Sequence, residues 1–251
     1  MSSKLITIVA GVGAGTGAAV ARRFAKAYPV VLLARTPESY TDLAKEINGS
    51  GGKAVGISTD VADAKSVANA LSEIKKEFGE DVKAAAAIFN ASGRFVRKPF
   101  LELSEEEFFA GLDVSARGAF LFSRAVLPLL LSTLTASPAA EYPPTLIFTG
   151  ATASVKANAL MSSFNTGKYA LRALSSSLAK EFGPQGVHVS HAIIDGVIDI
   201  PRTKEWLKDH PAGAEAKISA EGIADSYWYL HSQPRSTFTW ELDIRPFVEK
   251  W

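Results

Sequence analysis

The sequence predicts an α/β fold in which a sheet of parallel strands is covered by helices on both faces. Short apolar runs alternate along the chain with longer stretches of helical periodicity, and each run is apolar throughout, as strands buried on both faces are. The chain has 251 residues, 47% of them apolar, which is enough to bury one large core. We therefore expect one doubly wound domain over residues 1–251, with a mostly or wholly parallel sheet of seven strands.

The predicted strands are the short runs rich in β-branched and other apolar residues. They cover residues 5–10, 30–34, 54–58, 85–90, 145–149 and 187–194, with a last run near 238–244. The predicted helices are the stretches between them in which apolar residues recur with helical spacing. They cover residues 17–28, 39–48, 64–78, 105–134, 163–182 and 220–231.

Two segments fall outside these elements. Residues 135–144 are polar and contain three prolines, which predicts a surface insertion before the fifth strand. Residues 199–219 combine many charges with Trp206 and two prolines. This second segment is our candidate for a lid over a pocket.

The composition argues against several classes of function. The formal net charge is +1, so nothing favours binding to nucleic acid. There is no cysteine and the four histidines lack paired ligand spacing, so we expect no metal site. The longest apolar stretches are short and Pro128 interrupts them, so we expect no membrane span. A polar start without a signal sequence favours a cytoplasmic protein.

A glycine-rich loop follows the first predicted strand and opens the first predicted helix. It consists of Gly11, Val12, Gly13, Ala14, Gly15, Thr16 and Gly17. Glycines permit a tight turn and let backbone N–H groups approach a pyrophosphate, which then lies at the positive end of the helix. A strand before the loop and a helix after it are the context that this mechanism requires. The loop predicts a dinucleotide site, and a flexible turn without a ligand is the alternative.

The end of the second predicted strand indicates which dinucleotide is bound. NAD-binding proteins place a carboxylate there for the ribose hydroxyls, whereas an arginine suits a ribose 2′-phosphate. This strand ends at Ala34, and Arg35 follows it with no Asp or Glu at the strand end. We therefore predict that NADP(H) is preferred over NAD(H). A solvated surface charge is the alternative for Arg35.

Further motifs make the chain resemble the short-chain dehydrogenase/reductase family over essentially its whole length. The glycine loop matches the family fingerprint, although Ala10 replaces the threonine that usually precedes it. Asp60 and Val61 resemble the pair that contacts adenine, and residues 90–93 resemble the Asn-Asn-Ala-Gly element. Residues 117–120 and 125–128 are similar to the family's long fourth helix. The resemblance implies a three-layer Rossmann fold whose cofactor contacts, besides the loop and Arg35, are Asp60, Val61, Asn90, Ala91, Ser92, Lys168, Gly196 and Ile198.

The resemblance breaks down at the catalytic residues. An Asn-Ser-Tyr-Lys tetrad carries the chemistry of the family: the tyrosine hydroxyl gives or takes a proton, and the lysine lowers its pKa and holds the nicotinamide ribose. Here Lys168 is retained, while Phe164, Ala151 and Ser115 occupy the tyrosine, serine and asparagine positions. The family's Pro-Gly after the sixth strand becomes Asp195-Gly196.

Some neighbouring polar residues are candidates to replace the tyrosine. Thr149 would share the face of Ala151 if the strand continued that far, and Asp195 would be a general acid if burial raised its pKa. Tyr169 lies about 140° around the helix from Phe164 and should face elsewhere. For each candidate, an ordinary hydrogen-bonded residue is the alternative. The remaining candidates are Thr152, Ser163 and Asn165.

These observations favour an NADP(H)-dependent oxidoreductase of non-standard mechanism. Its substrate would be a small, hydrophobic carbonyl, enone or iminium compound. Enones and iminium compounds are favoured because neither Phe164 nor Ala151 can stabilise the alkoxide that a ketone would form. A catalytically silent dinucleotide-binding homologue, acting as a sensor or assembly partner, is the alternative, and a structural subunit of a hetero-oligomer is another. We also expect a homodimer or homotetramer through the helices 105–134 and 163–182. The candidates to line an apolar pocket are Phe95, Phe164, Trp206 and Trp240.

Overall fold

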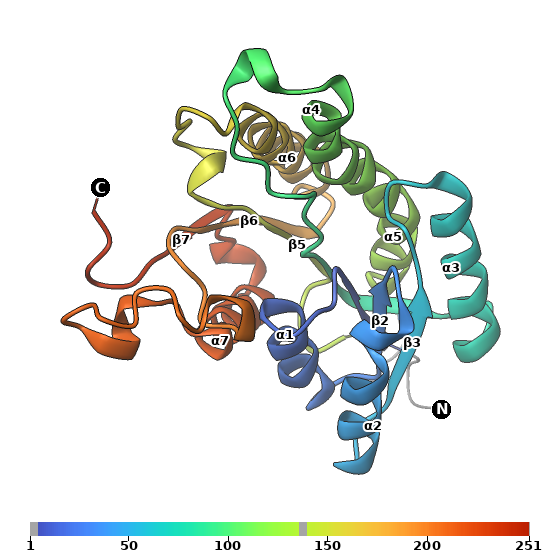
Figure 1. The fold of residues 1–251 in the computed structure, drawn as a ribbon. Helices are drawn as coiled ribbons and strands as arrows, with labels where there is room; N and C mark the ends of the chain where they lie inside the picture. Colours follow the sequence, from blue (N-terminus) through green and yellow to red (C-terminus); the bar gives the residue numbers. More distant parts are fainter. Residues whose placement is uncertain (1–4, 136–139, 251) are drawn as a thin grey trace.

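The computed structural model describes residues 5–135 and 140–250, and its centre is a sheet of seven parallel strands. The strand order is β3-β2-β1-β4-β5-β6-β7, so the chain crosses from one edge of the sheet back to its middle after β3 (Figure 1). The strands are β1 (Leu5–Ala10), β2 (Val30–Ala34), β3 (Ala54–Ser58), β4 (Lys83–Phe89), β5 (Thr145–Thr149), β6 (His188–Ile194) and β7 (Glu241–Ile244).

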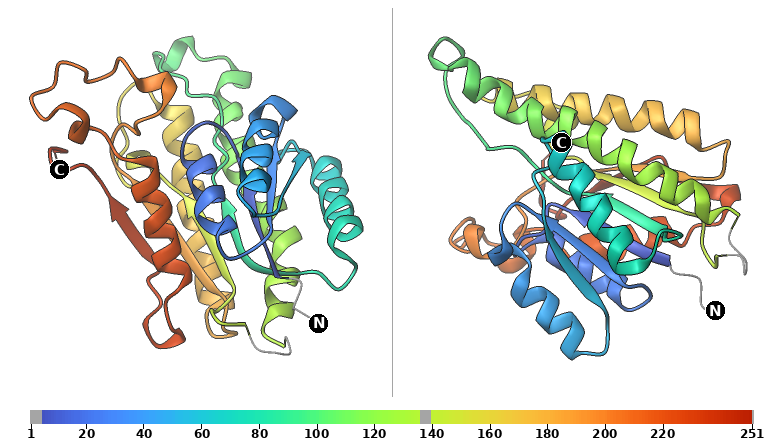
Figure 2. Two further views of the ribbon diagram at one scale, coloured as in Figure 1. Left: turned by 90° about the horizontal axis from the view of Figure 1, so that it is seen from below. Right: turned by 90° about the vertical axis from the view of Figure 1, so that its right-hand side faces the viewer.

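Helices cover both faces of the sheet and give the molecule three layers (Figure 2). One face carries α1 (Thr16–Ala25), α2 (Thr41–Gly49) and α7 (Ala220–His231). The other carries α3 (Ala64–Phe78), α4 (Glu105–Leu112), α5 (Ala119–Thr133) and α6 (Ser162–Phe182). Short 3₁₀ turns lie at Pro37–Ser39, Phe100–Glu102, Thr152–Ser154, Pro201–Thr203, Gly213–Ala216 and Arg235–Thr237. The predicted doubly wound fold is confirmed.

The two faces of β5 belong to two separate apolar cores. Leu146 and Phe148 pack in the core under α5 and α6, while Ile147 packs in the core under α1 and α7. Successive side chains of a strand point to opposite faces. The side chain of Thr149 therefore faces the α7 side, and Gly150 and the residues after it lead into the site.

The predicted strand bounds agree with the structure within a few residues, and four of the seven agree at both ends. The helical pattern predicted over 105–134 corresponds to one helical run, Glu105–Thr133. A π-helical turn, Asp113–Gly118, lies within it between α4 and α5, where α4 crosses α6 at very close range. A Cβ atom on Gly167 of α6 would lie 2.8 Å from the carbonyl oxygen of Gly111, so glycine is required at this crossing. Within the predicted insertion, residues 136–139 lie outside the described part of the chain.

The helical run Glu105–Thr133 also bears on membrane association. By length and composition it is the one segment within the described residues that could cross a bilayer, with a mean hydropathy of 1.4 over its most apolar window. Half of that window is buried inside the protein. This is the pattern of a helix that packs its apolar face on a sheet.

The carboxyl ends of the parallel strands place the candidate site. Neighbouring strands β1 and β4 lead into connections on opposite faces of the sheet, since β1 continues into α1 and β4 into α4. Open α/β sheets bind ligands in the crevice that forms at such a point. The loops that follow β1, β4, β5 and β6 all reach this edge.

Candidate functional site

The glycine loop is held in place by close backbone contacts with the segment after β4. Gly11 has φ +88°, and a Cβ atom there would lie 2.3 Å from the backbone nitrogen of Ala91. The Asn90 side-chain amide donates a 2.9 Å hydrogen bond to the carbonyl oxygen of Gly11. A Cβ atom on Gly17 would lie 2.5 Å from the same oxygen. Glycine at positions 11 and 17 is therefore needed for the loop to pack against β4.

The opposite side of the loop has the features of an anion site. A Cβ atom on Gly13 would meet no heavy atom within 4 Å, so the backbone is open to a ligand there. Helix α1 begins at Thr16 without a side-chain cap, and the Thr16 hydroxyl is buried without a hydrogen-bond partner in the described structure. Uncapped N–H groups and an unpaired hydroxyl at a helix N-terminus fit a diphosphate.

The remaining predicted cofactor residues line the same edge. Arg35 follows β2 and is exposed, and a backbone hydrogen bond of 2.7 Å from Thr59 to Ala34 brings Asp60 and Val61 beside it. Gly196 follows β6 with φ +144°, and Ile198 forms a bridge with Ile218. Ala14 and Ser92 are exposed in their loops. Their contact with a cofactor stays a prediction.

Lys168 lies buried at the end of β5. Its ammonium group donates a 2.9 Å hydrogen bond to the carbonyl oxygen of Thr149, and it lies 5.8 Å from the centre of the Phe164 ring. Burial lowers the pKa of Lys168 to about 8, because a charged amine loses hydration in the interior. Phe95 packs edge to face on Phe164, with the two ring centres 5.3 Å apart.

The condition under which Thr149 would share the face of Ala151, a strand that continues to Ala151, is not met. Strand β5 ends at Thr149, and its hydroxyl is 2.8 Å from the hydroxyl of Tyr227 on α7. Lys168 lies on the other face of the sheet, with α6. Thr149 contributes its backbone carbonyl to the site, whereas its side chain belongs to the opposite core.

Asp195 is near the site but is fully paired. One of its carboxylate oxygens accepts a short hydrogen bond from the Thr152 hydroxyl, and the other lies 3.2 Å from the guanidinium of Arg245. Both oxygens of this carboxylate are therefore engaged by neighbouring side chains. This geometry speaks against Asp195 as a general acid, and it engages Thr152 as well.

The other polar residues around Phe164 are directed elsewhere. The Ser163 hydroxyl donates to the carbonyl oxygens of Glu107 and Phe108, and the Asn165 amide donates to that of Asn158. Tyr169 is exposed on the outer face of α6, as its position around the helix predicted. Ser115 is buried in the π-helical turn against Gly167.

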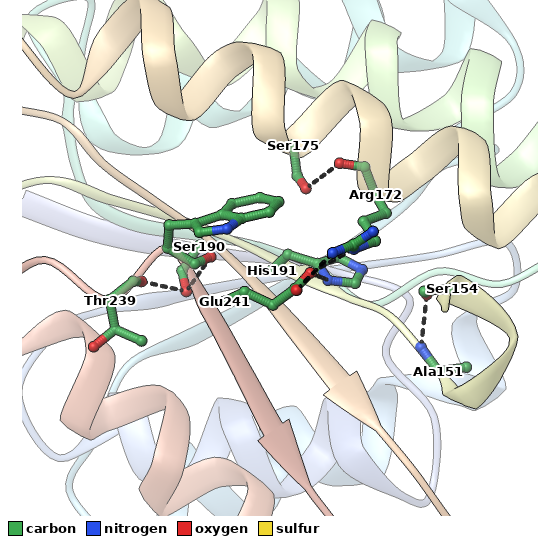
Figure 3. Close-up of polar contacts among 9 residues, drawn as sticks. Ala151, Ser154, Arg172, Ser175, Ser190, His191, Thr239 and Glu241 are labelled. Carbon is green, nitrogen blue, oxygen red and sulfur yellow. Dashed lines mark hydrogen bonds and ion pairs between the residues drawn. The ribbon is translucent and has the colours of Figure 1, made fainter. Parts of the chain in front are cut away.

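A network of charged side chains lies beside Gly150, directly after β5, and the sequence analysis did not predict it. Arg172 donates two hydrogen bonds, of 2.7 and 2.8 Å, to the carboxylate of Glu241, and His191 is 3.0 Å from the same carboxylate (Figure 3). Burial lowers the pKa of His191 to about 4 despite this carboxylate. Its Nε2 atom is buried against Gly150, where a Cβ atom would lie 2.3 Å away. The three residues come from α6, β6 and β7, and no local spacing connects them.

The residues expected to line an apolar pocket differ in their surroundings. Phe95 and Trp206 are each about half exposed, whereas the Trp240 ring packs 6.3 Å from the His191 ring. The predicted lid is closed at its base by the Ile198–Ile218 bridge and by a 3.0 Å ion pair between Lys217 and Asp199. Within residues 5–135 and 140–250, no group of three or more acidic or histidine side chains could hold a metal ion.

Comparison with known proteins gives one consistent answer. The family model described as short chain dehydrogenase matches residues 5–211. The chain is 30% identical to the short chain dehydrogenase pigC of Monascus ruber, over 96% of this chain and 80% of that protein. It is also similar to a crystal structure of a short-chain dehydrogenase from Rhodopseudomonas palustris, with a TM-score of 0.75, 29% identity and coverage of 96% and 99% of the two chains. An alcohol dehydrogenase from Thermococcus sibiricus, solved with 5-hydroxy-NADP, shares the fold, with a TM-score of 0.78, 22% identity and 98% coverage of both chains.

The close packing of the glycine loop predicts a steep penalty for Gly11→Ala. The new methyl group meets the Ala91 backbone, and φ +88° strains any residue other than glycine. We expect the free energy of unfolding in urea to fall by about 1–3 kcal/mol. Gly49→Ala is the matched control, because nothing lies within 4 Å of its new methyl group at the end of α2. Equal stability of Gly11→Ala and the parent would contradict the packing described here.

Proposed function

We propose how this chain, which belongs to the short-chain dehydrogenase family and is an oxidoreductase of that type, carries out its reaction. It transfers a hydride by a non-standard mechanism. The acceptor is a small, hydrophobic carbonyl, enone or iminium compound. The observation that carries the proposal is the replacement of the tyrosine hydroxyl by the Phe164 ring, 5.8 Å from the ammonium group of Lys168. Hydride transfer remains possible there, while ketone reduction loses its usual proton donor.

The cofactor in this proposal is NADP(H). When bound, it supplies or accepts the hydride. The open backbone at Gly13 and the uncapped start of α1 would hold its diphosphate, and Lys168 its nicotinamide ribose. Arg35, exposed at the end of β2, would pair with the ribose 2′-phosphate. The Thermococcus sibiricus protein of the same fold was solved with an NADP derivative, which supports this choice.

The side chains of the site limit the acceptor that it can serve. An alkoxide forming beside Phe164 and Ala151 would receive no hydrogen bond from either side chain. A conjugated acceptor spreads the charge away from the carbon that the hydride attacks, and an iminium becomes a neutral amine that needs no proton at its nitrogen. Phe95 and Phe164 pack edge to face and offer an apolar wall. The lid, residues 199–219, would close over the bound acceptor and exclude water.

A catalytically silent binding protein is the second candidate. The pairing of Asp195 with Arg245 favours it, because this pairing occupies the carboxylate at the end of β6. Such a protein would bind NADPH and oxidise it with none of the acceptors. A structural subunit would instead co-purify with a second related chain.

The role of Arg35 predicts the cofactor preference. We expect Arg35→Ala to weaken NADPH binding about 10- to 100-fold, the loss of one to two charge-assisted hydrogen bonds, and to change NADH binding by less than about threefold. Energy transfer from the four tryptophans to the reduced nicotinamide measures both affinities. Arg235→Ala, a change at an exposed arginine of a 3₁₀ turn, is the control. Equal losses for NADPH and NADH would remove the argument for NADP(H).

The absence of the tyrosine hydroxyl predicts the substrate profile. In assays of NADPH oxidation we expect 2-cyclohexenone and cyclic imines to be reduced faster than cyclohexanone. Phe164→Tyr restores a proton donor next to Lys168, so we expect it to raise the rate with cyclohexanone about 100-fold or more. Phe95→Tyr is the control, because it adds a hydroxyl on the neighbouring ring. Cyclohexanone as the best acceptor of the parent protein would disprove the proposed mechanism.

We also propose self-association through α4, α5 and α6. On this surface Phe109 and Phe120 are about half exposed, while Phe122, Val126 and Leu130 are buried in the protein's own core. We expect the parent to sediment as a dimer or tetramer and Phe120→Glu to sediment as a monomer, because burying an unpaired carboxylate costs more than the interface gains. Phe247→Glu, near the C-terminus, is the control. A Phe120→Glu variant that sediments like the parent would exclude this interface.

A further inference from the structure

We propose that Lys168 is the catalytic acid of this site, and that the acceptor is therefore a neutral group that gains a proton, an enone oxygen or an imine nitrogen, and not a permanent cation. This inference rests on the proposed function and narrows its substrate class. Its basis is the arrangement of donors and charges around Phe164.

Four polar side chains that were candidates to replace the tyrosine are committed to other partners. The Thr149 hydroxyl bonds to Tyr227 across the sheet, and the Thr152 hydroxyl bonds to Asp195. Ser163 and Asn165 bond to backbone carbonyls. Lys168 is then the proton-bearing side chain that the structure places at the Phe164 ring.

Lys168 has donors to spare. An ammonium group has three N–H donors, and its one hydrogen bond within the described residues goes to the carbonyl oxygen of Thr149. Phe164 on the adjacent turn of α6 accepts no conventional hydrogen bond. When the amine rotates away from the Thr149 carbonyl, its N–H donors would point toward a substrate atom that lies beside this ring.

The charges around Lys168 are balanced without it. Apart from solvent-exposed side chains such as Glu105 and Glu106 of α4, the charged and titratable groups on the elements packed against it are His191 and Asp195 of β6 and its end, Arg172 of α6 with Glu241 of β7, Glu107 of α4 with Lys98, and Asp113 with Arg117 of the π-helical turn. Asp195 pairs with Arg245, and Glu241, Glu107 and Asp113 each pair with the cation named beside them. His191 is neutral at pH 7, since burial lowers its pKa to about 4.

Among residues 5–135 and 140–250, the Lys168 ammonium is consequently a buried charge without a counter-ion. Burial lowers its pKa to about 8, so at pH 7 it carries a proton that it gives up readily. A general acid works best when its pKa lies near the working pH. The same charge repels a permanently cationic acceptor, because like charges in a poorly solvated site destabilise each other.

The proposed step balances. The hydride of the reduced nicotinamide adds to the carbon of the C=N bond, or to the β-carbon of the enone, and the displaced electron pair moves to nitrogen or oxygen. One N–H bond of Lys168 breaks and an N–H or O–H bond forms on the acceptor. The dinucleotide is oxidised by two electrons and the acceptor is reduced by two. Lys168 is left as a neutral amine and regains a proton from water.

The pH dependence of the parent protein is the first test. With 2-cyclohexenone and NADPH we expect kcat to fall about tenfold per pH unit above about pH 8, as the ammonium loses its proton. We expect N-methyl-3,4-dihydroisoquinolinium, a permanent cation, to be reduced at least about tenfold more slowly than 2-cyclohexenone at pH 7. A profile that stays flat to pH 10, or faster reduction of the cation, would overturn the inference.

The second test is Lys168→Arg, which keeps the positive charge but does not titrate near pH 8. We expect kcat with 2-cyclohexenone to fall about 100-fold or more and the decline above pH 8 to disappear. NADPH affinity, measured by energy transfer from tryptophan, should change by less than about tenfold, which separates acid catalysis from cofactor binding. Lys180→Arg, at the far end of α6, is the control. Should Lys168→Arg fail to fold, the pH profile of the parent decides alone.

These measurements separate the inference from the proposed function. Reduction of 2-cyclohexenone with an unchanged rate in Lys168→Arg leaves the proposed function standing and overturns the role of Lys168. NADPH binding without oxidation by any acceptor overturns both. Turnover with the expected pH decline and the loss in Lys168→Arg supports both.

Discussion

The burial of Lys168 is the constraint on which the arrangement of this site depends. Helix α6 brings the lysine under the end of β5, where the carbonyl oxygen of Thr149 receives its N–H group at 2.9 Å. This position requires the close crossing of α4 and α6, in which Gly111 and Gly167 leave no room for a side chain. Larger residues there would push α6 away and let water reach the amine. The lowered pKa of Lys168 is therefore a consequence of backbone packing as well as of its immediate neighbours.

The network of Arg172, Glu241 and His191 supports the same face of the sheet (Figure 3). It joins α6 to β6 and β7 through one carboxylate, which neutralises Arg172 and holds the His191 ring. The ring fills the space beside Gly150, where a larger residue would collide with it. The network thus fixes the backbone that presents the Thr149 carbonyl to Lys168. Because Glu241 is paired within this network, Lys168 remains a charge without an ion-pair partner in the described part of the chain.

Local patterns in the sequence predicted most of the fold and the cofactor loop, because these depend on residues close together in the chain. The apolar runs set the strands, and glycines between a strand and a helix set the loop. The side-chain partners of the site could not be found in this way. Asp195 meets Arg245, and Thr149 meets Tyr227, across separations of 50 and 78 residues that no spacing rule connects. The π-helical turn lies where α4 and α6 cross, a contact between segments far apart in the chain that leaves no local pattern in the sequence.

The free-energy cost of burying the charged Lys168 side chain bears on whether the site is active. A pKa of about 8 in the fold, against an ordinary value of 10.5, means that the unfolded chain holds the proton more tightly. Below pH 8 the ammonium therefore lowers the free energy of unfolding by about 3 kcal/mol, and this burden fades as the pH rises toward 10.5. A site kept only for packing would be more stable with an apolar residue at this position. The charge is understandable where the amine contacts a bound ribose, which would serve a working oxidoreductase and a silent dinucleotide-binding protein alike, and only the proposed proton donation would require turnover.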